Sequence, residues 1–205
     1  MIMMVLNKEK LKKIILGIIS VILIVSGLFF LINRMETKVT SQMLYSTQPY
    51  FTGTKPNSGY VALTCNIDLG WESEYVEGIL EALKKEDVKI TFNVTGRWAE
   101  KNQDLLLKIK EQTKFFQAPS GSFGENTVKA ATELGYTSIK WDIDTIDWNN
   151  RKEPEVVIER VKKKNIKENS IVLMHPTYAT TECIDDIIQI IRDKGLKPGR
   201  LSDVF

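Results

Sequence analysis

The chain has 205 residues and a single histidine, His175, which directly follows the apolar run at 171–174. An imidazole can transfer protons near neutral pH or bind a metal ion, so this residue could take part in catalysis. Three aspartates, Asp68, Asp144 and Asp147, also follow apolar runs and could act as bases or as ligands of a cation. Each has an ordinary alternative, because a histidine after a strand is often a hydrogen-bonded loop residue and aspartates often form turns. Residue type alone therefore does not assign a site.

Runs typical of strands alternate with runs typical of amphipathic helices from residue 59 to residue 205. We predict strands at 60–65, 89–94, 114–118, 137–143 and 170–174 with a final short strand at 201–205, and helices at 72–86, 97–112, 126–134, 154–164 and 183–191. This order is typical of βαβ units. It predicts an α/β domain with a mainly parallel sheet covered on both faces.

Unusual polar residues gather at the carboxyl ends of these strands, where parallel α/β folds place their sites. They are Asn66 and Asp68 after the first strand, Gln117, Pro119 and Gly121 after the third, Asp144, Asp147 and Trp148 after the fourth, and His175 after the fifth. The order of the chain therefore predicts that these groups meet at one rim. The alternative is that the tryptophan only covers the edge of the core and the Pro/Gly segment is only a turn.

The N-terminal part differs in character from the rest. Residues 14–32 are 19 consecutive residues without a charge. As a helix they would span roughly 28 Å at ~1.5 Å per residue, close to the thickness of a bilayer core. We predict a membrane anchor at 14–32, a cytoplasmic tail at 1–13 because four lysines precede the anchor, a polar stem at 33–58 and an extracellular domain at 59–205 of a cell-membrane protein. A cleaved signal peptide, the alternative, has a shorter apolar core and a small-residue cleavage site.

Net charge and cysteine content exclude several classes of function. The formal net charge is +2, which is too small to indicate nucleic acid as a partner. Cys65 and Cys183 are far apart and form no metal-binding pattern. We expect both to be free thiols.

Five segments together resemble the motifs of the polysaccharide deacetylase family (the NodB-homology domain, carbohydrate esterase family four). They are 61–68, 88–99, 119–123, 144–148 and 173–175, and they occur in the order that the family has. The resemblance implies a deformed (β/α) barrel. It also implies removal of N-acetyl groups from cell-wall or chitin-like amino sugars, with a divalent metal, usually zinc, as cofactor. It places His175, Asp144, Asp147 and Asn66 at catalytic positions.

The resemblance also implies roles for the remaining candidates, and it exposes departures. Pro119, Gly121, Trp148 and Gln117 would bind substrate, and Asp68 would be a metal ligand after a one-residue shift. Asn66 stands where the family has its catalytic base, and an amide cannot accept a proton near neutral pH. Gln117 stands where the family has the arginine that steadies that base. Losing both charges is coherent, since removing one would leave an unpaired buried charge costing roughly 3–5 kcal/mol.

A whole segment of the family is also missing. The strand, His-x3-His segment and helix expected after Gln112 have no counterpart, so one βα unit of about 30 residues is absent. Zinc at a catalytic site generally has at least three protein ligands. Three hypotheses follow: a membrane-anchored deacetylase, a non-catalytic glycan-binding or scaffold domain that has lost its metal site, and a chain with an internal deletion that folds poorly.

Overall fold

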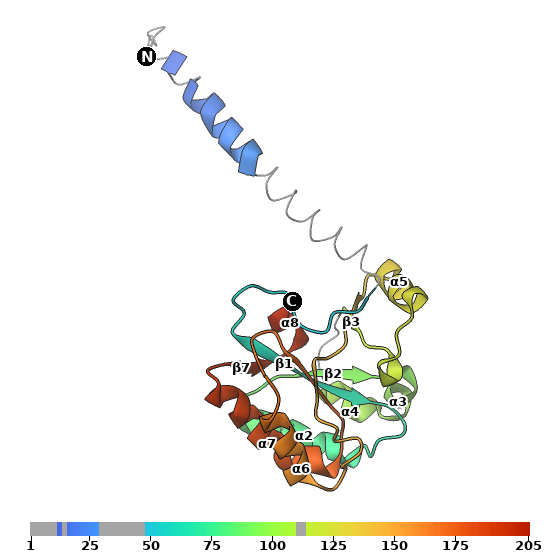
Figure 1. Cartoon of the computed structure of the whole chain (residues 1–205). Helices are drawn as coiled ribbons and strands as arrows, with labels where there is room; N and C mark the ends of the chain where they lie inside the picture. Colours follow the sequence, from blue (N-terminus) through green and yellow to red (C-terminus); the bar gives the residue numbers. More distant parts are fainter. Residues whose placement is uncertain (1–11, 14–15, 29–47, 110–113) are drawn as a thin grey trace, which may run out of the picture. The chain divides into compact units, whose positions relative to one another are not determined.

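The structure of the protein, a computed structural model, describes residues 12–13, 16–28, 48–109 and 114–205. The chain divides into two compact units, Met1–Ser46 and Thr47–Phe205. In the first unit, residues 16–28 form a helix with exposed apolar side chains (Figure 1). In the described ranges, no helix combines the length and the apolar character that crossing a membrane requires. Both ends of the predicted anchor, 14–15 and 29–32, lie outside the described residues.

Strand β1 (Tyr60–Ile67) is the centre of a five-stranded parallel sheet. The sheet order is β2 (Thr91–Val94), β1, β6 (Ile171–Met174) and β5 (Ile143–Asp144). Strand β7 (Lys197–Gly199) pairs with residues 60–62 of β1, whereas β2 pairs with residues 64–67. Because β6 occupies one edge of β1, β2 and β7 share the other edge. The predicted α/β class with a parallel sheet is therefore confirmed.

The side chains of β1 alternate between two hydrophobic clusters, as the period of a strand requires. Val61, Leu63, Cys65 and Ile67 belong to the larger cluster, and Ala62 belongs to the smaller one. Asn66 has the same parity as Ala62, so its side chain projects from the face opposite the larger cluster. The alternation thus brings a polar side chain to the carboxyl end of a buried strand.

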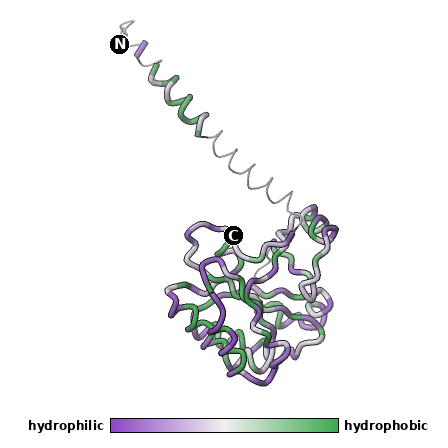
Figure 2. The backbone as a smooth tube through the Cα atoms, in the orientation of Figure 1, coloured by the Kyte–Doolittle hydropathy of each residue, from purple (hydrophilic) through white to green (hydrophobic). Residues whose placement is uncertain are grey.

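Three helices cover the face of the larger cluster. They are α2 (Glu74–Lys85), α6 (Pro154–Lys162) and α7 (Tyr178–Asp193), and α7 contacts both of the others. Figure 1 shows them together on one side of the sheet. Each is amphipathic, and in Figure 2 hydrophilic and hydrophobic colours alternate along these helices. The shorter helices α3 (Gly96–Lys101) and α4 (Gln103–Lys108) follow β2.

A second, two-stranded parallel sheet pairs β3 (Phe115–Phe116) with β4 (Thr137–Ser138). Between these strands lie the 3-10 turn η1 (Pro119–Gly121) and helix α5 (Glu125–Glu133). The strand predicted at 137–143 is thus divided between β4 and β5. The described strands form two separate sheets, so the expected deformed barrel is not confirmed.

The last residues form a helix rather than the predicted strand. Helix α8 (Leu201–Val204) follows β7, and its first turn is closed by hydrogen bonds between Arg200 and Asp203. Leu201 and Val204 are both fully buried in the smaller cluster. Their spacing of three residues suits one turn of a helix, which explains why the prediction of a strand was wrong.

Residues 48–58, which were predicted as the end of the stem, bond to the domain along their length. The backbone of Tyr50 pairs with that of Ser138 and Lys140, Gly53 N–H donates to the Asn169 carbonyl, and Lys55 N–H donates to the Val204 carbonyl. The folded unit therefore extends ahead of the predicted start at residue 59. The rest of the predicted stem lies outside the described residues.

Candidate functional site

A pocket of about 530 Å³ opens at the carboxyl ends of the parallel strands. Eight of the nine predicted site residues line it: Asn66, Asp68, Gln117, Pro119, Gly121, Asp144, Trp148 and His175. The ninth, Asp147, is fully buried and bonds to His175. The convergence at one rim that the order of the chain predicted is therefore present in the structure, while the roles of the residues stay predictions.

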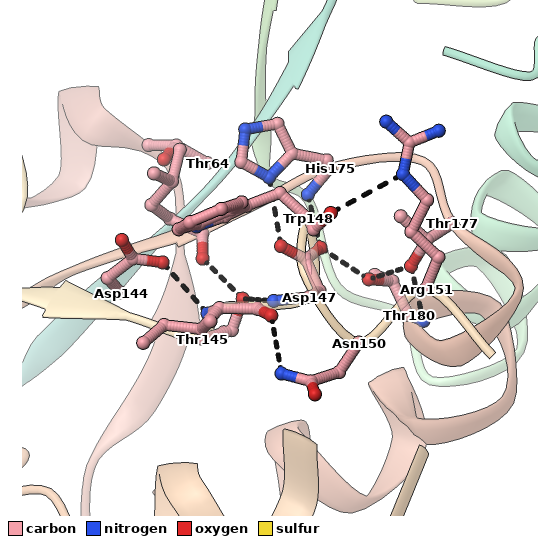
Figure 3. A network of polar contacts seen from close by, with 12 residues as sticks. Thr64, Asp144, Thr145, Asp147, Trp148, Asn150, Arg151, His175, Thr177 and Thr180 are labelled. Atoms are coloured by element: carbon pink, nitrogen blue, oxygen red, sulfur yellow. Dashed lines mark hydrogen bonds and ion pairs between the residues drawn. The ribbon is translucent and has the colours of Figure 1, made fainter. Parts of the chain in front are cut away.

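His175 is held by a buried carboxylate. Asp147 Oδ2 accepts the backbone N–H of His175 at 2.6 Å and the hydroxyl of Thr180 at 2.6 Å, and Asp147 Oδ1 lies 2.9 Å from His175 Nδ1 (Figure 3). A carboxylate only accepts, so Nδ1 carries the proton and Nε2 is the ring nitrogen left for other contacts. The imidazole is thus fixed in tautomer and in orientation, with 9% of the residue exposed.

Strand β5 ends at Asp144, and the loop after it supplies Asp147, Trp148 and Arg151 beside His175 (Figure 3). Asp144 Oδ1 accepts the N–H of Ile146 at 2.8 Å, and Ile146 has a positive φ of 57°. This conformation is uncommon for a β-branched residue and indicates strain at a loop that carries candidate site residues. The strained turn places the indole of Trp148 at the surface, where 47% of the residue is exposed.

Trp71, which is not among the site residues predicted from the sequence, lies against the histidine. Its ring stacks on the imidazole of His175 with a centroid distance of 4.5 Å, and the Cζ of Arg151 lies 4.3 Å from its centroid. Arg151 also pairs with Glu72 at 3.6 Å. This stack ties the loop after β1 to the loop after β5. No local sequence pattern marks the pairing, because the partners lie about a hundred residues apart in the chain.

Three side-chain amides form the floor of the pocket. Asn93 Nδ2 donates to Asn66 Oδ1 at 2.9 Å and to Gln117 Oε1 at 2.8 Å. Asn66 and Asn93 are paired residues of the neighbouring strands β1 and β2. Gln117 Nε2 is buried without a hydrogen-bond partner among the described residues. A buried donor without a partner lowers the stability of the folded state by about 1–3 kcal/mol. The cluster thus contains two hydrogen bonds and one unsatisfied donor.

Gly121 and Trp141 also line the pocket and contact each other closely. Gly121 has a φ of +63°, and a Cβ atom added there would lie 2.5 Å from Trp141 Cη2. The backbone of Lys140, next to Trp141, bonds to Tyr50 in the segment that precedes β1. The glycine is therefore required both by its conformation and by the approach of the indole.

The two thiols are unsuited to nucleophilic chemistry. Burial, and next the charge of Asp147, raise the pKa of Cys65 well above its ordinary value. Burial, followed by the same carboxylate, raises the pKa of Cys183 to about 12. Because the thiolate is the reactive form, neither cysteine is a candidate nucleophile.

The donor set does not fit the zinc ion that the family resemblance implies. Within the described ranges, no group of three or more His, Cys, Asp or Glu side chains could hold a metal ion. The predicted ligand Asp68 is exposed, and its Oδ1 accepts the N–H of Gly70 at 2.7 Å in its own loop. His175 Nδ1 is engaged by Asp147. The site geometry therefore offers two groups where catalytic zinc needs three.

Comparison with known proteins identifies the family. Residues 53–113 match the family described as "Polysaccharide deacetylase". The crystal structure of a CE4 family pseudoenzyme from Bacillus anthracis resembles this one with a TM-score of 0.67 at 33% sequence identity, covering 78% of this chain and 69% of that chain. The chain belongs to the polysaccharide deacetylase family. A mutant of that pseudoenzyme, whose structure is described as having restored enzymatic activity, is similar at 32% identity and a TM-score of 0.67, covering 78% of this chain and 72% of that one.

Two sequence relatives are also similar to this chain. YlxY of Bacillus subtilis, a protein named as uncharacterized, is 30% identical over 198 residues, which is 77% of this chain. The peptidoglycan-N-acetylglucosamine deacetylase of Bacillus cereus is 25% identical over 194 residues, covering 73% of this chain and 69% of the enzyme. The chain spans 60% of the length of YlxY. The predicted membership of the polysaccharide deacetylase family is confirmed.

Proposed function

We propose that this member of the polysaccharide deacetylase family is a non-catalytic glycan-binding protein whose ligand is an N-acetylated polysaccharide of the cell wall or of chitin type. One observation carries the proposal: the position of the family's base is an amide, Asn66, bound into a cluster of neutral amides. Without a base and without three metal ligands, the pocket cannot activate water against an amide bond.

The lining of the pocket supports sugar binding. Three tryptophans, Trp71, Trp141 and Trp148, line the pocket together with amides and a Pro/Gly turn. Indole rings offer broad apolar faces, and a few polar groups beside them fix the orientation of a ligand. Trp148 is the better candidate for stacking because 47% of it is exposed, whereas Trp71 is already stacked on His175.

The proposal includes a membrane location. Residues 14–32 would anchor the protein in the cell membrane with the N-terminus in the cytoplasm, which would present the folded unit to wall glycan on the outside. Its support is the run of 19 uncharged residues and the lysines that precede it.

Glycan binding can be tested on the full chain in detergent micelles by calorimetry with a hexamer of N-acetylglucosamine. Binding is expected to survive a chelator. The variant Trp148→Ala is expected to weaken it at least about tenfold, equivalent to ~1.4 kcal/mol. Tyr136→Ala is the matched control, since Tyr136 is 44% exposed and does not line the pocket. Absence of binding to this hexamer and to solubilised peptidoglycan would contradict the proposal.

Catalysis is the competing outcome, and a specific contact favours it. The His175–Asp147 pair would suit a general acid. Acetate release from the hexamer that disappears in His175→Ala would establish a deacetylase and overturn the non-catalytic reading. We expect the wild type and His175→Ala both to release acetate only at the background rate.

A further inference from the structure

The three floor amides have a definite polarity that is set by the middle residue. Asn93 Nδ2 carries two hydrogens, and each is donated to a different oxygen, Asn66 Oδ1 and Gln117 Oε1. An amide that accepts through its oxygen must turn its NH2 group elsewhere. Asn66 lines the pocket and its oxygen is engaged by Asn93, so Nδ2 is the polar side-chain atom that it has left for a ligand.

From this polarity, the geometry points to Asn66, Asn93 and Gln117 as the residues that distinguish an N-acetylated sugar from the free amino sugar. This inference rests on the proposed function of the pocket. The carbonyl oxygen of an acetamido group accepts a hydrogen bond from Asn66 Nδ2. An ammonium group at the same place would set donor against donor, and nothing in the amide cluster carries a charge to offset it.

One oxygen of each carboxylate that lines the pocket accepts a hydrogen bond within its own loop. Asp68 Oδ1 accepts from Gly70 N and Asp144 Oδ1 accepts from Ile146 N. The groups that define the floor are therefore the neutral amides. Gln117 Nε2 is buried and lacks a hydrogen-bond partner in the part of the chain that the structure describes.

Turning all three amides over would keep the heavy atoms in place and exchange every donor for an acceptor. Two substitutions separate the two arrangements and add the same charge. In Asn93→Asp the central group only accepts, so Asn66 and Gln117 both donate to it and Asn66 presents its oxygen to the pocket. In Gln117→Glu the outer group only accepts, so Asn93 remains a donor and Asn66 keeps its NH2 group toward the pocket.

The experiment measures binding of two hexamers of equal length, one of N-acetylglucosamine and one of glucosamine, to the full chain in detergent micelles at pH 7. The wild type is expected to bind the acetylated hexamer at least about tenfold more tightly. Asn93→Asp is expected to lose about tenfold for the acetylated hexamer, while Gln117→Glu stays within roughly threefold of the wild type. The acetylated ligand is neutral, so the added charge common to both variants does not account for a difference between them.

Thermal unfolding of each variant accompanies the binding measurement, and Asn126→Asp, exposed and outside the pocket, controls for the charge change. The preference of the wild type for one of the two hexamers tests the inference even if a variant does not fold. Equal binding of both hexamers, or a preference for the amine, would overturn the inference and leave the proposed function standing. Unchanged affinity of folded Asn93→Asp for the acetylated hexamer would also overturn it. Failure of the wild type to bind either hexamer would overturn this inference, and failure to bind solubilised peptidoglycan as well would remove the proposed function.

Discussion

Asp147 holds His175 by two atoms at once, the backbone N–H at 2.6 Å and Nδ1 of the ring at 2.9 Å. The aspartate comes from the loop after β5, and the histidine directly follows the neighbouring strand β6. A single buried carboxylate therefore joins two adjacent strand ends and fixes the ring that points to the pocket. Thr180, at the start of α7, is the third donor to the same group.

Asp147→Asn is expected to lower the free energy of unfolding by roughly 2–4 kcal/mol. The side chain of asparagine has one acceptor atom and one NH2 group, whereas three buried donors face this position. The charge-assisted hydrogen bonds are lost, and the donors compete for the single oxygen. Urea unfolding followed by circular dichroism measures the change. Asp144→Asn is the control: Asp144 is half-buried and the variant keeps an oxygen for Ile146 N–H, so we expect a loss below about 1 kcal/mol. Equal losses in the two variants would contradict this account of Asp147.

Gly121→Ala and Gly135→Ala separate a backbone effect from a steric one. Both glycines have positive φ, +63° and +79°, but only a Cβ atom at Gly121 would meet a neighbour, Trp141 Cη2 at 2.5 Å. A left-handed conformation costs an L-residue roughly 1–2 kcal/mol, which is the loss expected for Gly135→Ala. Gly121→Ala is expected to lose about 1–3 kcal/mol more, because the indole must move. Unfolding free energies and the tryptophan emission of the folded state report both effects, and an unchanged emission in Gly121→Ala would argue against the close approach.

Much of the site could be predicted because parallel sheets place their carboxyl ends at one edge. Asn66, Gln117, Asp144 and His175 each follow an apolar run, and this local signal was enough to bring them to one pocket. The strand at 60–67 and the amphipathic helix around Ile187 were predictable from periodicity for the same reason.

The contacts that complete the site depend on long-range packing. The stack of Trp71 on His175 joins residues far apart in the chain, and no local pattern distinguishes this tryptophan from one that covers the core. Asn93 lies within a predicted strand and matches only a glycosylation sequon (Asn93-Val94-Thr95), a pattern that does not indicate its place at the centre of the amide cluster. The segment at 48–58 looks like a polar stem because many of the bonds that hold it to the domain are backbone bonds, which carry no sequence signature.

The thiols provide a probe of global opening. Burial raises the pKa of Cys65 and that of Cys183, the latter to about 12, so the thiolate fraction of the native protein at pH 8 is minute. We expect a disulfide reagent such as Ellman's to label neither thiol in the folded chain at pH 8 and both in denaturing urea. A labelling rate in the native protein equal to that in urea would contradict the burial of these groups. Because Cys183 lies on α7 and Cys65 on β1, mass spectrometry of partly labelled protein would also show whether the helix opens before the sheet.

Asp203 makes the free energy of unfolding depend on pH in the acid range. Burial by itself raises the pKa of this carboxyl, but hydrogen bonds from the backbone and the guanidinium of Arg200 outweigh burial and leave the pKa below its usual 3.8. A pKa that is lower in the folded state stabilises the protein above the unfolded value, and this contribution is lost as pH falls through the folded value. The difference in unfolding free energy between the wild type and Asp203→Asn is therefore expected to be constant above about pH 5 and to shrink below about pH 4. We expect it to stay below about 1 kcal/mol, because the pair is partly exposed and screened by solvent. Urea unfolding at a series of pH values tests this, with Arg200→Met as the second variant. The backbone N–H of residue 200 still donates to Asp203 in that variant, so adding Asp203→Asn is expected to remove a smaller part of the pH dependence than it removes from the wild type. An effect as large as that in the wild type would contradict the contribution of the guanidinium.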